Sequence, residues 1–176
     1  MSIIRPVRPE QAGSELSGVY EGLTKKFGKV PNIFGVMAHR PEALKHLLPF
    51  FNAVMAQGTV APRYKELAYL KTSMLNGCEY CTKAHLASAK RVGITDEQVK
   101  AVQSYARSSQ FDEKDKAVLL YAERITRGAA AMRQASIDAL AQYFKEDEIV
   151  ELTLVVCLAN LTNRFNDALQ VEPDLG

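Results

Sequence analysis

Two cysteines and one histidine lie close together in the middle of the chain. They are Cys78, Cys81 and His85, with Glu79 and Tyr80 between the two cysteines. On a helix, residues three or four apart are surface neighbours, so these three side chains form one column. A pair of thiols beside an imidazole is the arrangement that a thiol redox centre requires.

A predicted helix boundary just before this pair affects the chemistry of the thiols. Asn76 and Gly77 predict the end of one helix, so we expect Cys78 in the first turn of the next. Unpaired N–H groups and the positive end of the helix dipole favour thiolate there, and should lower the thiol pKa below the about 8.5 of free cysteine. A thiolate attacks peroxides, and a second cysteine captures the resulting sulfenic acid as a disulfide.

Other uses of a CxxC pair are a metal site and an inert buried pair. A structural zinc site takes four ligands, usually from two such pairs or from one pair and two later histidines. Only His85 is near, because His39 and His46 lie far upstream. Redox chemistry is therefore favoured, and we expect no metal and no bound cofactor. The third cysteine, Cys157, lies in an apolar run, so we expect it in the core.

The composition indicates one globular domain over residues 1–176. Hydrophobic residues make up 47% of the chain and charged residues 24%, which suffices for a core. The net charge is +2 and the two signs alternate, so neither nucleic acid nor a membrane is expected as a partner. The first residues lack an apolar signal segment, and no window approaches the about 18 apolar residues of a membrane span. We expect a cytoplasmic protein, where a CxxC pair is more typical of catalysis or metal binding than of a structural disulfide.

Helical spacing and helix boundaries recur along the chain, and strand signals are nearly absent. We therefore expect an all-α fold of about seven or eight helices, which excludes the thioredoxin fold with its strands around the CxxC. Helical spacing or a helix-start signal marks residues 9–27, a segment from Pro31, residues 41–57, 62–76 and 78–93, a segment from Thr95, and residues 112–126, 135–144 and 147–169.

A faint internal similarity appears when the chain is shifted by 85 positions. Cys78 then falls on Asn163, and Cys81 falls on Asn166. The pattern indicates either two degenerate helical repeats or two unrelated amphipathic helices, and both interpretations stay open.

The spacing of the reactive residues resembles a known family. Glu66 lies 12 residues before Cys78, and Glu66 with the CxxC pair and His85 is similar to AhpD-like alkylhydroperoxidases. These form the peroxidase-related branch of the carboxymuconolactone decarboxylase superfamily. Segments 28–32 and 160–166 are similar to the family's amino-terminal segment and last helix, so the resemblance covers residues 20 to 170 and implies an AhpD-like helical domain.

The resemblance implies a role for each reactive residue. Cys81 attacks the peroxide, Cys78 resolves the product and exchanges with a reductant, and Glu66 with His85 forms a proton relay. The chain departs from characterised AhpD proteins at Tyr80, where they have a histidine. With an ordinary pKa of about 10, tyrosine cannot replace that base near neutrality. The expected reductant is a dithiol, either a lipoyl group, which the resemblance implies, or a thioredoxin-like protein. The resemblance also implies a homo-oligomer.

The leading hypothesis is a CxxC dithiol peroxidase that reduces small organic hydroperoxides. One alternative is a disulfide oxidoreductase or redox sensor without efficient peroxide turnover. A second is a carboxymuconolactone-type decarboxylase, which is disfavoured because that branch does not use a CxxC pair. A metal-binding protein is the third.

Overall fold

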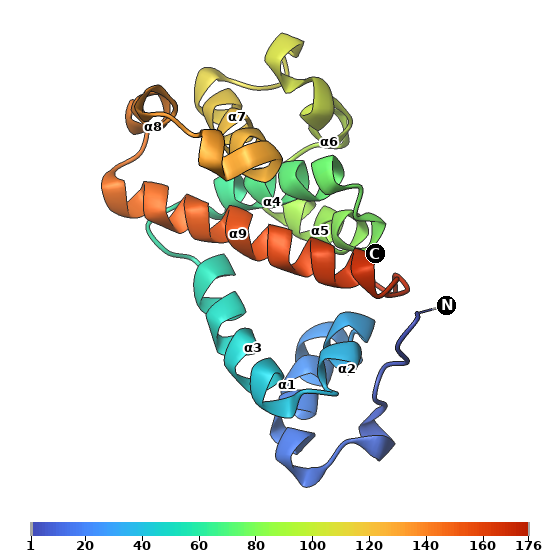
Figure 1. Ribbon diagram of the computed structural model, residues 1–176. Helices are drawn as coiled ribbons and strands as arrows, with labels where there is room; N and C mark the ends of the chain where they lie inside the picture. Colours follow the sequence, from blue (N-terminus) through green and yellow to red (C-terminus); the bar gives the residue numbers. More distant parts are fainter. Residues whose placement is uncertain (1, 176) are drawn as a thin grey trace.

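The computed structural model describes residues 2–175, and its regular secondary structure is helical (Figure 1). The all-α prediction is confirmed, with nine α-helices and no strand in this part of the chain. The helices are α1 (Ser17–Phe27), α2 (Asn32–Met37), α3 (Pro41–Met55), α4 (Pro62–Asn76), α5 (Glu79–Arg91), α6 (Asp96–Ala101), α7 (Glu113–Gly128), α8 (Gln134–Ala141) and α9 (Glu146–Ala168). Four short 3₁₀ segments are Pro9–Gln11, Ser14–Leu16, Val102–Arg107 and Ala129–Ala131.

Most helix boundaries follow the local signals, but the first one does not. The expected single helix over 9–27 is wrong at its start, because Gly13 takes an extended conformation between two 3₁₀ turns. Helix α1 then ends as predicted at Gly28, whose φ of 76° suits glycine. The capping box of Thr95 and Gln98 at the start of α6 is also confirmed.

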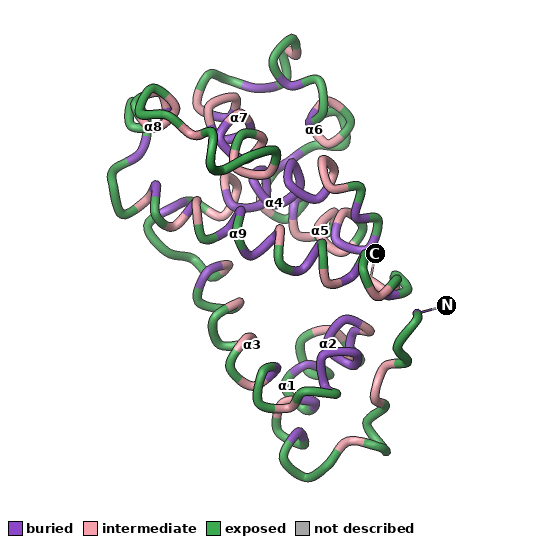
Figure 2. Tube along the Cα trace, viewed as in Figure 1, coloured by how far each residue is buried: buried purple, intermediate pink, exposed green. Residues whose placement is uncertain are grey.

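Helix α4 forms the centre of the fold, packed between α5, α7 and α9 (Figures 1 and 2). Every residue from 65 to 73 is buried, including Lys65 and Lys71. The Lys65 ammonium pairs with Glu151 of α9, and the Lys71 ammonium lies 2.8 Å from a carboxylate oxygen of Glu123 on α7. Because a buried charge is costly unless it is paired, these ion pairs fix how α7 and α9 lie on α4.

The structure of helix α9 can be compared with that of α4 and α5, the segments that the possible internal repeat relates to it. The shift by 85 positions places Gly77, where α4 ends, on Thr162. Thr162 lies inside α9, which continues without a break to Ala168. The two related segments therefore differ in structure, since the first is two helices and the second is mainly one.

Helices α1, α2 and α3 form a separate group on one side of α9, and α3 leads from it to the centre of the fold (Figure 1). Phe34 holds this group together, with its ring 6.4 Å from each of the rings of Phe27 and Phe51. Within residues 2–175, no helix is both long and apolar enough to cross a lipid bilayer.

Candidate active site

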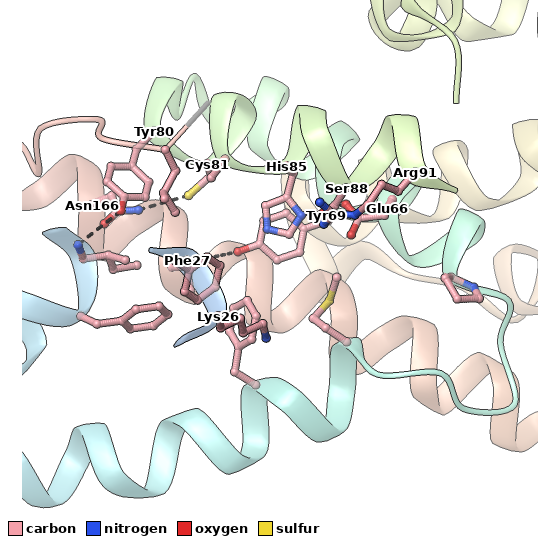
Figure 3. Close-up of a pocket in the computed structure, with 18 of the residues that line it drawn as sticks. Lys26, Phe27, Glu66, Tyr69, Tyr80, Cys81, His85, Ser88, Arg91 and Asn166 are labelled. Atoms are coloured by element: carbon pink, nitrogen blue, oxygen red, sulfur yellow. Dashed lines mark hydrogen bonds and ion pairs between the residues drawn. The ribbon is translucent and has the colours of Figure 1, made fainter. Parts of the chain in front are cut away.

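A cavity of about 320 Å³ lies where the α1–α3 group meets α4, α5 and α9 (Figure 3). Its volume is at the lower end of the range of small-molecule sites, about 300–1,000 Å³. One wall comes from the α1–α3 group and is mainly apolar. Its large side chains are Phe27, Phe34, Phe51 and Met55, and Lys26 of α1 also lines the cavity. The opposite side carries the polar groups Glu66, Tyr69, Cys81, His85 and Asn166.

The turn between α4 and α5 positions the two cysteines. Gly77 ends α4 with a φ of 73°, and the Cys78 N–H then donates to the Ser73 carbonyl. Cys78 is the N-cap of α5, so Cys81, rather than Cys78 as expected, lies in the first helical turn. Cys81 is 2% exposed and lines the cavity, whereas Cys78 is 0% exposed and lies behind it. A small molecule in the cavity therefore meets Cys81.

The surroundings of the two sulfurs push their pKa values apart. A hydrogen bond from the Cys78 thiol, together with those from Asn163 and Asn166 and the charge of His85, lowers the pKa of Cys81 to about 7 against the opposing effect of burial. The same hydrogen bond to Cys81, followed by burial, raises the pKa of Cys78 well above its ordinary value. Of the two thiols, Cys81 is therefore the one whose surroundings favour the thiolate near neutral pH, and those of Cys78 favour the protonated form.

His85 and Glu66 form a direct pair, in keeping with the relay that the resemblance to AhpD-like proteins implied. The Nδ1 atom of His85 lies 2.8 Å from Oε2 of Glu66, and both side chains are largely buried. A carboxylate accepts, so Nδ1 carries the proton and Nε2 remains available for proton exchange. In Figure 3, the imidazole lies between Cys81 and Glu66.

The orientation of the His85 ring is also fixed by an aromatic neighbour. It stacks on the Tyr69 ring, with centroids 3.6 Å apart and planes at 15°. The Tyr69 hydroxyl in turn lies 2.5 Å from Oγ1 of Thr162, which itself donates to backbone carbonyls of α9. The imidazole thus has a fixed orientation before any substrate enters.

Asparagines of α9 complete the site around Cys81. The Asn166 Nδ2 donates to the Cys81 sulfur at 3.2 Å, and Asn163 is held by Ser73 and Asn76 of α4. The Oδ1 of Asn166 is buried and has no hydrogen-bond partner among the described residues. A buried acceptor without a hydrogen-bond partner is energetically costly, so this amide is held in place at the expense of some stability.

The Tyr80 side chain connects parts of the fold and does not act as a base. Its hydroxyl donates to Asp174 at 2.8 Å and accepts from the N–H of Ile33, and the Asp174 carboxylate also accepts from the N–H of Asn32. Burial, with the nearby Asp174 charge, raises the pKa of Tyr80 well above its ordinary value. Tyr80 therefore stays protonated and joins the C-terminal segment to α2 and α5.

The structure brings all four predicted site residues to one place, and it adds residues that the sequence analysis assigned no role. Asn163 and Asn166 are the most important of these. The signal that could have indicated them is the spacing of three asparagines at steps of three on one side of α9, Asn160, Asn163 and Asn166. The expectation for Cys157 is wrong, because Cys157 is exposed on α9. Within residues 2–175, no three His, Cys, Asp or Glu side chains are gathered as they would be around a metal ion.

Comparison with known proteins identifies relatives of the sequence and of the fold. The model of the carboxymuconolactone decarboxylase family matches residues 41–124, which include both cysteines, His85 and Glu66. The uncharacterised protein YdfG of Bacillus subtilis (strain 168) is 22% identical over 130 residues, which are 73% of this chain and 88% of YdfG.

Two solved structures share the fold over nearly the whole chain. One is an uncharacterised peroxidase-related protein from Ralstonia eutropha JMP134, described as an alkylhydroperoxidase AhpD core; its TM-score is 0.86 at 22% identity, with 97% of this chain and 93% of that one covered. The other is the debrominase Bmp8, with a TM-score of 0.82 at 22% identity, and 97% and 91% of the chains covered. At this level of identity, the two likenesses establish the fold alone.

Proposed function

Because this chain belongs to the carboxymuconolactone decarboxylase superfamily and has the AhpD-like fold, we propose that it is a dithiol peroxidase for organic hydroperoxides. The observation that carries this proposal is the state of Cys81. Its sulfur faces an apolar cavity, accepts an N–H from Asn166 and has its pKa lowered to about 7. This is a nucleophile placed where an organic substrate can reach it.

In the first step, the Cys81 thiolate attacks the terminal oxygen of the hydroperoxide ROOH, and the O–O bond breaks. Cys81 becomes a sulfenic acid, and the alkoxide leaves with the proton that His85 took from the thiol. The products are Cys81–SOH and ROH. Glu66 supports this transfer because its contact with Nδ1 fixes the imidazole tautomer and stabilises the imidazolium.

Asn166 and the apolar wall both support this step. The Nδ2 group of Asn166 donates to the Cys81 sulfur and so stabilises the attacking thiolate. The apolar wall formed by Phe27, Phe34, Phe51 and Met55 holds the organic group of the substrate.

In the second step, the Cys78 thiol attacks the sulfenic sulfur of Cys81. A disulfide forms and water leaves. An external dithiol then reduces the disulfide and becomes oxidised itself, so the balance is ROOH plus a dithiol giving ROH, water and a disulfide. No bound cofactor is required by these steps.

The test is peroxide consumption by the reduced protein, with dihydrolipoamide supplied and the Cys78–Cys81 disulfide followed by mass spectrometry. The wild type should consume cumene hydroperoxide over many turnovers. Cys81→Ser should abolish consumption, and Cys78→Ser should permit one rapid turnover that ends at the sulfenic acid. Full activity of Cys81→Ser contradicts the proposal. A disulfide that forms only by exchange with dithiols indicates a disulfide oxidoreductase or sensor instead.

A further inference from the structure

The cavity lining includes two cations that the proposed reaction does not use, Lys26 of α1 and Arg91 of α5. Both residues are exposed, so they lie where the cavity opens to solvent. The Lys26 ammonium donates to Oδ1 of Asn52 at 3.0 Å, and the Arg91 guanidinium donates to Oγ of Ser88 at 2.7 Å. Both hydrogen-bond partners are neutral, so each cation can still accept the charge of an anionic ligand.

One face of α5 carries both the nucleophile and one of these cations. Cys81, His85, Ser88 and Arg91 follow one another at steps of four, three and three, and all four line the cavity. In Figure 3 they succeed one another in this order, and Lys26 comes from the opposite side. The 10 residues from Cys81 to Arg91 correspond to about 15 Å along the helix. A molecule of medium length can therefore meet Cys81 with one end and Arg91 with the other.

The charges of the cavity lining favour an anion at this open end. Among the described lining residues Glu66 is the one carboxylate, and its Oε2 is already paired with His85 at 2.8 Å. Burial raises the pKa of Tyr69 and Tyr80, so their hydroxyls stay neutral. An arginine binds a carboxylate through two parallel hydrogen bonds, and a lysine binds it as a point charge. The open end is thus suited to a carboxylate.

We propose that the substrate is an organic hydroperoxide that also bears a carboxylate, which Arg91 and Lys26 bind while the hydroperoxide group meets Cys81. The inference rests on the proposed peroxidase function and narrows its substrate class. The carbon chain between the two groups lies against the apolar wall of Phe34 and Phe51. The carboxylate takes no part in the cleavage of the O–O bond, so the balance of the reaction is unchanged and the product is the corresponding hydroxy acid.

The first test compares two substrates that differ only in charge, octanoic acid with a hydroperoxide on its last carbon and the methyl ester of that acid. Because each exposed ion pair contributes modestly, kcat/KM of the wild type should be about three- to tenfold higher for the acid. High salt should reduce this preference. Arg91→Gln and Lys26→Gln should each bring the ratio of acid to ester towards one.

Lys25→Gln and Lys90→Gln are the matched controls, because each removes one exposed positive charge next to a tested position and neither residue lines the cavity. Both should keep the wild-type ratio. Equal kcat/KM for acid and ester in the wild type overturns the proposal. A ratio that the two cavity variants lower no more than the two controls also overturns it.

A second test measures binding without peroxide chemistry. Octanoate and methyl octanoate carry no hydroperoxide, and each can protect Cys81 from iodoacetamide by occupying the cavity. Octanoate should protect at a lower concentration than the ester, and Arg91→Gln should remove that difference. Protection by octanoate in a protein that consumes no hydroperoxide would support the carboxylate site and contradict the peroxidase. Consumption of both hydroperoxides at equal rates, with equal protection by octanoate and its ester, would contradict the carboxylate site and leave the peroxidase standing.

Discussion

The amide of Asn166 donates to the sulfur of Cys81 at 3.2 Å, although the two residues are 85 positions apart in the chain. The contact joins the last helix to the first turn of the helix that holds the cysteine pair. It lies beside the pair of His85 and Glu66 and completes the polar side of the cavity (Figure 3). The reactivity of Cys81 thus depends on how α9 lies on α5.

Replacing Asn166 with alanine should raise the pKa of Cys81. A hydrogen bond to a charged group contributes about 1.5–3 kcal/mol, which corresponds to about one to two pH units. Since the wild-type pKa is about 7, roughly half of Cys81 is thiolate at that pH and most of it is thiol in the variant. Alkylation should be several-fold slower at pH 7 and normal at high pH, as followed by thiolate absorbance and iodoacetamide labelling. Leu161→Ala, at an exposed position of the same helix, is the control. An unchanged Cys81 titration in Asn166→Ala would contradict the assigned role.

Glu66→Gln should slow peroxide reduction without preventing thiolate formation. The substitution keeps the shape of the side chain but removes the charge that stabilises the His85 imidazolium. We expect the rate to fall about 10- to 100-fold, the loss that follows removal of the carboxylate partner of a metal-bound histidine. Stopped-flow measurement of cumene hydroperoxide reduction against pH is the check. Glu79→Gln removes an exposed carboxylate of α5 that pairs with Lys83, and its rate should equal that of the wild type.

Phe51→Ala should reduce the preference for organic over inorganic peroxide. Phe51 lines the apolar wall, so its loss should weaken binding of cumene hydroperoxide by about 1–3 kcal/mol, or roughly 10- to 200-fold in kcat/KM. Hydrogen peroxide does not reach this wall and should be unaffected. The neighbouring Phe50→Ala provides a matched control, because Phe50 is exposed on the same helix and does not line the cavity. Equal loss for both peroxides would show that Phe51 supports the fold rather than the substrate.

A small dithiol should reduce the oxidised protein faster than a folded thioredoxin does. In the described structure Cys78 is fully buried, and Cys81 is almost buried and lines the cavity. A bulky protein surface therefore cannot approach either sulfur directly. A dihydrolipoyl group can enter such a cavity. Rates of disulfide reduction with dihydrolipoamide and with thioredoxin, compared at equal thiol concentration, test this. Faster reduction by thioredoxin would mean that α5 opens to expose Cys78.

Gly58→Ala should destabilise the protein. A β-carbon at this position would meet the Glu151 carboxylate, which accepts from the backbone N–H groups of Thr59 and Val60 and pairs with the buried Lys65. Displacing that carboxylate leaves Lys65 poorly compensated, and overpacking alone typically costs about 1–3 kcal/mol. Urea denaturation measures the loss. Gly22→Ala, in an open position on α1, should instead be neutral or stabilising by up to about 1 kcal/mol.

The sequence was sufficient for those features that depend on local spacing. The helices follow from apolar periodicity and from glycine and proline signals. The pairing of His85 with Glu66 was implied by the resemblance of residues 66–85 to a family motif. The role of Asn166 was not expected from the sequence, because its proximity to Cys81 depends on the packing of helices that are far apart in the chain. The apolar wall of the cavity could not be predicted for the same reason, since Phe27, Phe34, Phe51 and Met55 meet the cysteine helix only through tertiary packing. Cys157 was misplaced because its apolar neighbours suggested the core, whereas α9 is apolar on both faces.

The cavity draws its apolar wall from the α1–α3 group and its reactive groups from α4, α5 and α9. Most of the large apolar side chains that line the cavity therefore come from a first stretch of the chain, before residue 56, whereas Glu66, Cys81 and His85 come from after it. Mutations that remodel the first stretch can alter which molecules enter while leaving the nucleophile and its supports intact. A single thiol centre can in this way serve different substrates as lineages diverge, and segment exchange between relatives at this boundary offers a direct route to new specificities.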